Sequence, residues 1–189
     1  KNLHRSTHCG IILIKNFLTI TEHENIKKII AKNKDKYINF KKNEHIITQD
    51  MTVWRMKENK YSNDDIDFSS IKILENKFLE IRKHLNTNIA YDNIHILSTF
   101  YKQGSKGISP HVDFSKFINM TGIYIVFGKN NFCIADDKNR LNEQQFDAYD
   151  NSLILMRCPR NKNELHLRKI QIKKSIFYCP SDSPLYSVS

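Results

Sequence analysis

Two residues near the middle of the chain have side chains and a spacing suited to metal binding: His111 and Asp113. Residues two apart on an extended strand point to the same face, so an imidazole nitrogen and a carboxylate oxygen can converge on one ion. A third ligand must come from elsewhere, and His166 is the only histidine after Asp113. Two histidines and one carboxylate on one face of an octahedral ion leave three positions open, which is the geometry of non-haem Fe(II) sites.

Each of these residues also has an ordinary explanation. The pattern His-x-Asp recurs by chance, and after Pro110 the pair His111 and Asp113 can form a polar turn. A single histidine such as His166 is by default a surface residue or a hydrogen-bonded core residue. The metal-site interpretation therefore depends on further matches in the neighbouring segments.

Hydrophobic periodicity predicts the elements that position these residues. Residues 9–18 contain a short apolar run, which is typical of a strand. Thr19 and Glu22 have the spacing of a capping box, which predicts that a helix begins there. A second helix is predicted roughly over residues 71–85, where apolar residues recur at three- and four-residue spacing.

Strand-like segments dominate the rest of the chain. Residues 46–56 alternate enough to be strand-like, and after the second helix short β segments follow one another. We predict these later strands at residues 94–101, 122–127, 131–135, 152–156, 166–170 and 174–178. Helices first and many short strands afterwards indicate an α+β protein whose main body is an antiparallel sandwich or barrel.

Three aromatic or basic residues are further candidates for contact with a substrate. Trp54 and Arg55 precede the predicted barrel, and Tyr124 follows the predicted metal-binding strand. A buried position in the core is the more common role for a tryptophan or a tyrosine in such segments. We therefore expect core packing for Trp54 and Tyr124. The alternative is substrate recognition for Trp54 with Arg55, and a place in the lining of the pocket for Tyr124.

Several segments together resemble a known family. Residues 101–115, which run from Tyr101 through His111-Val-Asp113, look like the metal-binding strand of the Fe(II)/2-oxoglutarate dioxygenases, including the prolyl hydroxylase branch. Residues 150–156, followed by His166, resemble the strand and turn that deliver the family's distal histidine. Residues 173–178 resemble the strand after it. The order of these matches is that of the family.

The resemblance implies a fold and a set of roles. The fold would be a double-stranded β-helix, a jelly-roll or cupin-like barrel, with the N-terminal helices packed on one sheet. The cofactors would be Fe(II), 2-oxoglutarate and O2. The iron ligands would be His111, Asp113 and His166, and the contacts to 2-oxoglutarate would come from Lys173, Ser175 and Tyr101.

The implied reaction is hydroxylation of a C–H bond, coupled to conversion of 2-oxoglutarate to succinate and CO2. We expect a protein side chain or a small molecule as the substrate. An AlkB-like oxidative demethylase of nucleic acid is an alternative that we do not prefer, because Thr99-Phe-Tyr101 replaces that branch's Asn-x-Tyr and Cys179 stands where its second arginine would fall. A non-catalytic β-helix that binds a partner is a second alternative.

Length and composition agree with one domain. The 189 residues suffice for one core, and we expect a single domain in which residues 1–93 support a metal-binding β core at 94–180. The four cysteines form no Cys-x-x-Cys motif, no apolar run is long enough to span a membrane, and we expect an intracellular, cytoplasmic protein. Oligomeric state has no signal in the sequence.

The charge has two interpretations. The formal net charge is +10, and 23 of the 30 basic residues are lysines. A groove that binds phosphates would more convincingly combine clustered arginines with exposed aromatic side chains. We therefore prefer solvated lysines to a polyanionic partner.

Overall fold

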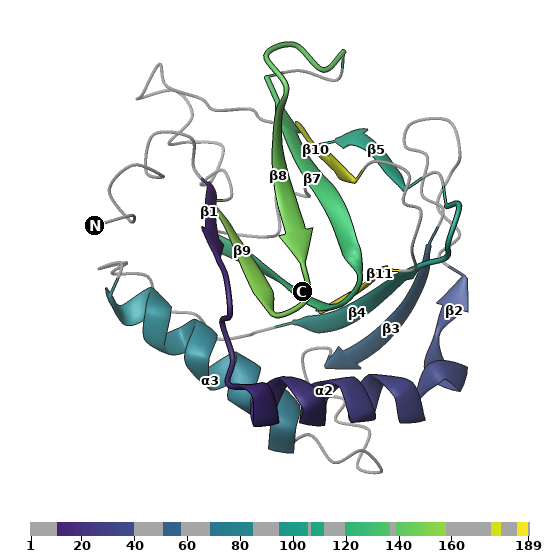
Figure 1. The fold of residues 1–189 in the computed structure, drawn as a ribbon, viewed down its shortest axis with the longest axis vertical. Coiled ribbons are helices and arrows are strands. Elements are labelled where there is room, and N and C mark those ends of the chain that lie inside the picture. Colours follow the sequence, from purple (N-terminus) through teal and green to yellow (C-terminus); the bar gives the residue numbers. More distant parts are fainter. Residues whose placement is uncertain are drawn as a thin grey trace.

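Two antiparallel β-sheets face each other, and two helices lie against the larger sheet (Figure 1). The protein is described from a computed structural model. It describes residues 11–39, 51–57, 69–84, 95–105, 107–111, 120–136, 139–157, 175–178 and 185–188. No helix within these ranges is long and apolar enough to cross a membrane.

The larger sheet has seven strands, and every strand pair in it is antiparallel. In spatial order these are β1 (Ile11–Ile14), β9 (Ser152–Arg157), β6 (Met120–Phe127), β11 (Leu185–Val188), β4 (Ile96–Tyr101), β3 (Thr52–Lys57) and β2 (Ile38–Asn39).

The smaller sheet has four strands and is also antiparallel throughout. In spatial order these are β5 (Ile108–His111), β10 (Ser175–Tyr178), β7 (Lys129–Ala135) and β8 (Gln144–Tyr149). From β4 onward, the chain passes repeatedly between the two sheets.

Helix α2 (Ile20–Lys32) begins at the predicted capping box. The Thr19 side chain accepts from the backbone N–H of Glu22, and the Glu22 carboxylate accepts from the backbone N–H of Thr19 at 2.8 Å. The same carboxylate lies 2.8 Å from the Lys77 amine on helix α3 (Ser69–His84). The first turn of α2 is thus both capped and fastened to the neighbouring helix. A short 3-10 turn, η1 (Lys34–Lys36), follows α2.

Among the described residues, the two larger parts of the core lie on the two faces of the larger sheet. Side-chain alternation on β6 makes the division clear: Tyr124 and Val126 pack under the helices, whereas Ile123 and Ile125 pack between the sheets. We call these the helix layer and the inter-sheet layer. A site between the sheets is therefore separated from the helices by one full sheet.

Most predicted elements are confirmed. Both helices are present, and predicted strands correspond to β1, β3, β4, β6, β7, β9 and β10. Strands β2, β8 and β11 were not predicted, and β5 was expected only from the resemblance of residues 101–115 to a metal-binding strand. The predicted strand at 166–170 lies outside the described residues. Trp54 is only 4% exposed and packs in the helix layer, so its core role is confirmed.

Candidate functional site

His111 is the last residue of β5, and its side chain faces the inter-sheet layer. It pairs with Ile176 of β10, which in turn pairs with Ile134 of β7. Residues directly opposite in antiparallel strands have their side chains on the same face. Because Ile134 is fully buried between the sheets, His111 lies on the inner face as well, and only 9% of it is exposed.

A β-bulge gives His111 this orientation. Ile176 and Tyr178 of β10 are two residues apart, but their partners His111 and Ile108 are three apart. In a regular strand two residues three apart point to opposite faces, whereas the extra residue of a bulge can bring both to one face. Pro110 is compatible with this position, since β5 is an edge strand and bulges tolerate a missing N–H. Ile108 and His111 are accordingly both buried.

A backbone contact determines the tautomer of the neutral imidazole. His111 Nδ1 lies 2.8 Å from the carbonyl oxygen of Ser109. A carbonyl can only accept, so the hydrogen in this bond is on Nδ1, and in the neutral ring the lone pair is on Nε2. Histidines that bind metals commonly donate their other ring N–H in this way. The ring is therefore held in a form that suits coordination through Nε2.

Tyr101 lies on the opposite sheet and borders the same layer. It is the last residue of β4, is 4% exposed, and belongs to the inter-sheet cluster that includes Ile108 and Ile134. Ser175 is the first residue of β10, and its backbone adjoins Ile176, the partner of His111. Three predicted site residues thus come from strands that enclose one layer.

The other three predicted site residues, Asp113, His166 and Lys173, lie outside the described residues. Within the described part of the chain, no group of three or more His, Cys, Asp or Glu side chains could hold a metal ion. The ligand set therefore stays a prediction, with His111 as the member whose surroundings are described.

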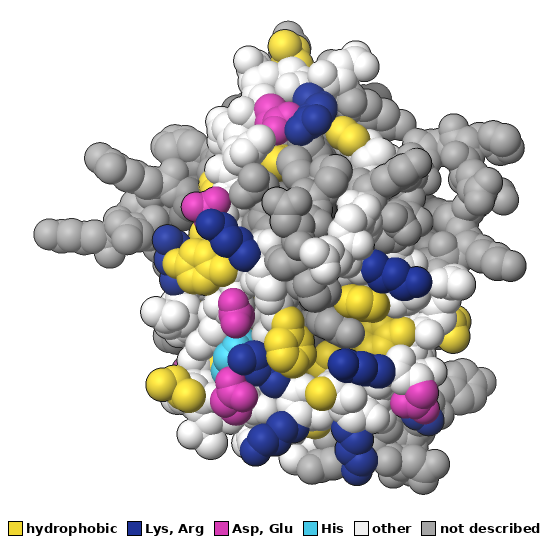
Figure 2. Space-filling model, turned by 45° about the vertical axis from the view of Figure 1, so that its right-hand side comes forward, with side chains coloured by type: hydrophobic (Ala, Val, Ile, Leu, Met, Phe, Trp, Pro, Cys, Tyr) yellow, Lys and Arg dark blue, Asp and Glu magenta, His cyan; other side chains and the backbone are white. Residues whose placement is uncertain are grey.

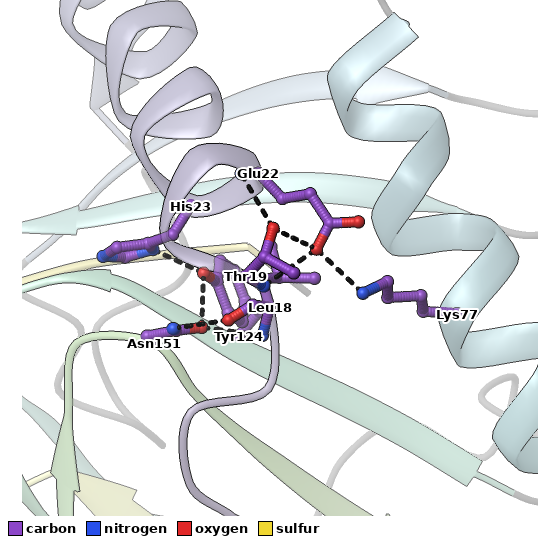
Figure 3. Close-up of polar contacts among 7 residues, drawn as sticks. All are labelled: Leu18, Thr19, Glu22, His23, Lys77, Tyr124 and Asn151. Carbon is purple, nitrogen blue, oxygen red and sulfur yellow. Dashed lines mark hydrogen bonds and ion pairs between the residues drawn. The ribbon is translucent and has the colours of Figure 1, made fainter.

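A second polar cluster lies in the helix layer and was not predicted (Figure 3). His23 on α2 contacts the Tyr124 hydroxyl on β6, and that hydroxyl donates to Asn151 Oδ1 at 3.2 Å. The Asn151 side chain also accepts from the N–H of Leu18 and donates to its carbonyl, each at 2.9 Å. Tyr124 therefore ties α2 to the larger sheet and faces away from the inter-sheet layer. The positive φ of Asn151, 58°, identifies a turn that asparagine favours.

Burial shifts the pKa values of both ring side chains in this cluster. Desolvation raises the pKa of Tyr124 well above its usual value, and it lowers the pKa of His23, with Lys27 adding to the effect. The neutral forms are therefore favoured, and the cluster acts as a structural tie.

On the face shown in Figure 2, the coloured Lys and Arg side chains lie among acidic and hydrophobic side chains. Two lysines cover aromatic rings: Lys15 lies 5.2 Å from the centre of the Tyr149 ring, and Lys27 lies 5.3 Å from that of Phe127.

Comparison with known proteins finds similarity in structure but not in sequence. No protein-family model matches the chain, and no curated protein matches it. A prolyl hydroxylase from Trichoplax adhaerens, solved in complex with a peptide of hypoxia inducible factor, matches with a TM-score of 0.74 and 12% identity, over 98% of this chain and 84% of that one.

Two further solved structures agree with the first. A 2OG-Fe(II) oxygenase family protein from Burkholderia pseudomallei matches with a TM-score of 0.68 and 10% identity, over 98% of this chain and 84% of that one. The viral collagen prolyl hydroxylase of Paramecium Bursaria Chlorella virus-1, solved with 2OG, matches with a TM-score of 0.61 and 12% identity, over 95% and 93%. The chain has the fold of these oxygenases, and the predicted resemblance to the prolyl hydroxylase branch is confirmed at the level of the fold.

Proposed function

We propose that this protein is an Fe(II)- and 2-oxoglutarate-dependent oxygenase that hydroxylates a protein substrate. The observation that carries the proposal is the fold similarity to a prolyl hydroxylase over 98% of the chain. The orientation of His111 supports it, because a buried imidazole with its Nδ1–H donated to a carbonyl has a form suited to a metal ligand.

We further propose that β4 to β11 form a double-stranded β-helix within a single domain. The strand order supports this: β4, β6, β9 and β11 belong to the larger sheet and β5, β7, β8 and β10 to the smaller. Eight antiparallel strands divided between two sheets in this way are typical of a jelly roll.

The predicted ligand set for Fe(II) is His111, Asp113 and His166. When bound, the iron would supply the O2 activation that couples decarboxylation of 2-oxoglutarate to hydroxylation. The chain's own part is to hold the ion with two imidazoles and one carboxylate, and to exclude water with the apolar inter-sheet layer around His111.

The predicted contacts to 2-oxoglutarate are Lys173, Ser175 and Tyr101. A carboxylate taken into a buried layer needs a cation or hydrogen-bond donors, because an unpaired buried charge is costly. Tyr101 borders the inter-sheet layer and has a hydroxyl that can donate. Lys173 would supply the charge, as the family resemblance implies.

A protein substrate is preferred because the Trichoplax adhaerens enzyme was solved with a peptide. A small molecule remains the alternative within the same reaction class. Demethylation of nucleic acid is ranked below both, since Thr99-Phe-Tyr101 and Cys179 depart from the AlkB-like pattern.

The test is an anaerobic Fe(II) titration with and without 2-oxoglutarate, followed by visible absorption. We expect a weak charge-transfer band that requires both components and is lost in His111→Ala and Asp113→Ala. His95→Ala is the matched control, since His95 is exposed and lies just before β4. Absence of the band in the unmodified protein, with no effect of 2-oxoglutarate on metal binding, would reject the proposal.

A further inference from the structure

The turn between β7 and β8 leaves the smaller sheet at the level of His111. Paired residues form one row across this sheet: His111, Ile176, Ile134 and Gln144. Gln144 is the first residue of β8, so the connection from β7 begins directly beyond this row. Figure 1 shows this hairpin projecting past the other strands of the smaller sheet at the top of the view. We call residues 139–143, the described part of this turn after Asp136, the hairpin arm.

Hydrogen bonds close the hairpin arm. The backbone N–H of Asp136 donates to the carbonyl of Leu141 at 2.9 Å, and the Asn142 amide donates to the Asp136 carboxylate at 2.8 Å. These two bonds join the ends of the turn. The bond from Asp136 to the Leu141 carbonyl therefore fixes the backbone of Leu141 in the turn.

An ion pair stiffens the same turn. The Arg140 guanidinium contacts both carboxylate oxygens of Glu143, with the second contact at 3.0 Å, and Gln145 donates to Glu143 at 2.9 Å. Arg140 holds the pKa of Glu143 below its usual value. A two-contact arginine–carboxylate pair fixes orientation as well as distance, so the arm has a defined shape before any partner binds.

The turn combines an exposed apolar side chain with strained backbone on both sides of it. Arg140 and Asn142 both have positive φ, 66° and 51°, on either side of Leu141. Arginine rarely adopts this region, and local strain of this kind clusters at binding sites. Leu141 is 59% exposed and is one of three exposed large hydrophobic side chains in the described part of the chain.

We propose that Leu141 contacts the polypeptide substrate and helps to determine which sequences are oxidised. The inference rests on the proposed function, because it takes His111 as a marker of the reaction centre. The arm stands outside the inter-sheet layer, so a small molecule held beside His111 would not reach it, whereas an extended peptide would.

The spacing of the strands predicts where the contact falls. Three strand spacings separate β5 from β8, or roughly 14 Å, and an extended peptide advances about 3.3 Å per residue. Leu141 lies three residues beyond the row, so the full separation is roughly 14 to 17 Å. An apolar side chain about four or five residues from the oxidised residue would therefore lie on Leu141. A rigid arm favours such a contact because little freedom is lost on binding.

The test uses short fluorescein-labelled peptides with one central proline, in which leucine or serine stands about four or five residues to either side. Binding to the full chain, loaded anaerobically with Fe(II) and 2-oxoglutarate, is measured by fluorescence anisotropy. We expect one leucine peptide to bind about tenfold more tightly than its serine counterpart. Leu141→Ser should remove that preference, and Leu141→Met should keep it.

Ile38→Ser is the matched control, because Ile38 is 64% exposed and lies on β2 of the larger sheet. It should leave the leucine preference unchanged. Equal binding of the leucine and serine peptides, no peptide binding, or a preference that survives Leu141→Ser would overturn the inference. The charge-transfer band of the same samples separates the two proposals: a band without a leucine preference rejects only the role of Leu141, and no band rejects the oxygenase.

Discussion

The Tyr124 hydroxyl lies 2.5 Å from Nδ1 of His23, and this contact joins helix α2 to strand β6 through the helix layer. Tyr124 has one hydroxyl hydrogen, which it donates to Asn151 Oδ1. His23 must therefore donate from Nδ1 to the tyrosine oxygen. His23 on α2 therefore donates to Tyr124 on β6, and Tyr124 donates to Asn151 in the turn before β9.

The lowered pKa of His23 predicts a loss of stability in mild acid. Its ordinary value is 6.5, and burial keeps the folded-state pKa below that value, with Lys27 opposing protonation and Asp150 and Glu24 favouring it. The unfolded chain therefore takes up the proton first as the pH falls. The contribution of neutral His23 to the free energy of unfolding is complete above about pH 6.5, and it is lost as the pH falls through the folded-state pKa.

Urea unfolding of the unmodified protein and of His23→Gln between about pH 7.5 and 5 measures this effect. The difference in the free energy of unfolding between the two proteins should shrink toward acid pH. A difference that is independent of pH would contradict the assignment of a lowered pKa to His23.

Two asparagines with positive φ give a matched pair of substitutions. Asn151 has φ 58° and Asn142 has φ 51°, so glycine relieves the backbone at both positions. The Asn151 side chain bonds Leu18 and Tyr124, whereas Asn142 bonds the exposed Asp136. Asn151→Gly should lower the free energy of unfolding by about 2 kcal/mol, and Asn142→Gly should change it by less than about 0.5 kcal/mol. Chemical denaturation measures both variants. If their free energies of unfolding fall by similar amounts, the hydrogen bonds of Asn151 add little to stability.

Gly122 lets helix α3 approach β6. A Cβ at this position would lie 2.8 and 2.9 Å from two ring carbons of Phe78. Gly122→Ala should lower the free energy of unfolding by about 1–3 kcal/mol, because the ring must move within a packed layer. Phe78→Leu in the Gly122→Ala background should recover part of that loss in a double-mutant cycle.

Gly104→Ala is the control for this cycle. Its φ is +73°, and a Cβ there would meet no atom within 4 Å, so only backbone strain is expected, of about 1 kcal/mol. Phe78→Leu should leave that smaller loss unchanged. If Phe78→Leu recovers none of the stability that Gly122→Ala loses, the contact between the helix and the strand is looser than these distances indicate.

Metal loading should stabilise the fold through His111. A ligand that binds only the folded protein adds about 2.7 kcal/mol when its concentration is a hundred times its dissociation constant. Mn(II) with 2-oxoglutarate should therefore raise the melting temperature of the unmodified protein, and EDTA should reverse the rise. In His111→Ala the melting temperature should not respond to either addition, whatever its starting value. A full response in this variant would remove His111 from the ligand set.

The helices were predictable because local signals agree with the tertiary packing. The capping box at Thr19 and Glu22 marks the start of α2, and the apolar residues of that helix, such as Ile26 and Ile30, are those buried. Central strands were found for a similar reason: β6 and β9 have both faces covered, so they are continuous apolar runs.

The missed strands have weak local patterns. In β8, the edge strand of the smaller sheet, Ala148 is the only fully buried residue, and three of its six residues are glutamine or aspartate. Such a sequence looks like a loop until a partner strand is known. The row of partners across the smaller sheet cannot be read from the sequence either, since it depends on which strands become neighbours. The sequence therefore pointed to His111 but not to the hairpin arm.

Strand β11 comes after every other described strand in the chain, yet it lies between β4 and β6 in the middle of the larger sheet. Ribosomes deliver the chain from its N-terminus, so β4 and β6 leave the exit tunnel well before the residues that will join them. Until residues 185–188 pair, no described strand joins β4 to β6, and the larger sheet consists of two halves. We expect chaperones on the nascent protein to meet the unpaired inner edges of these halves.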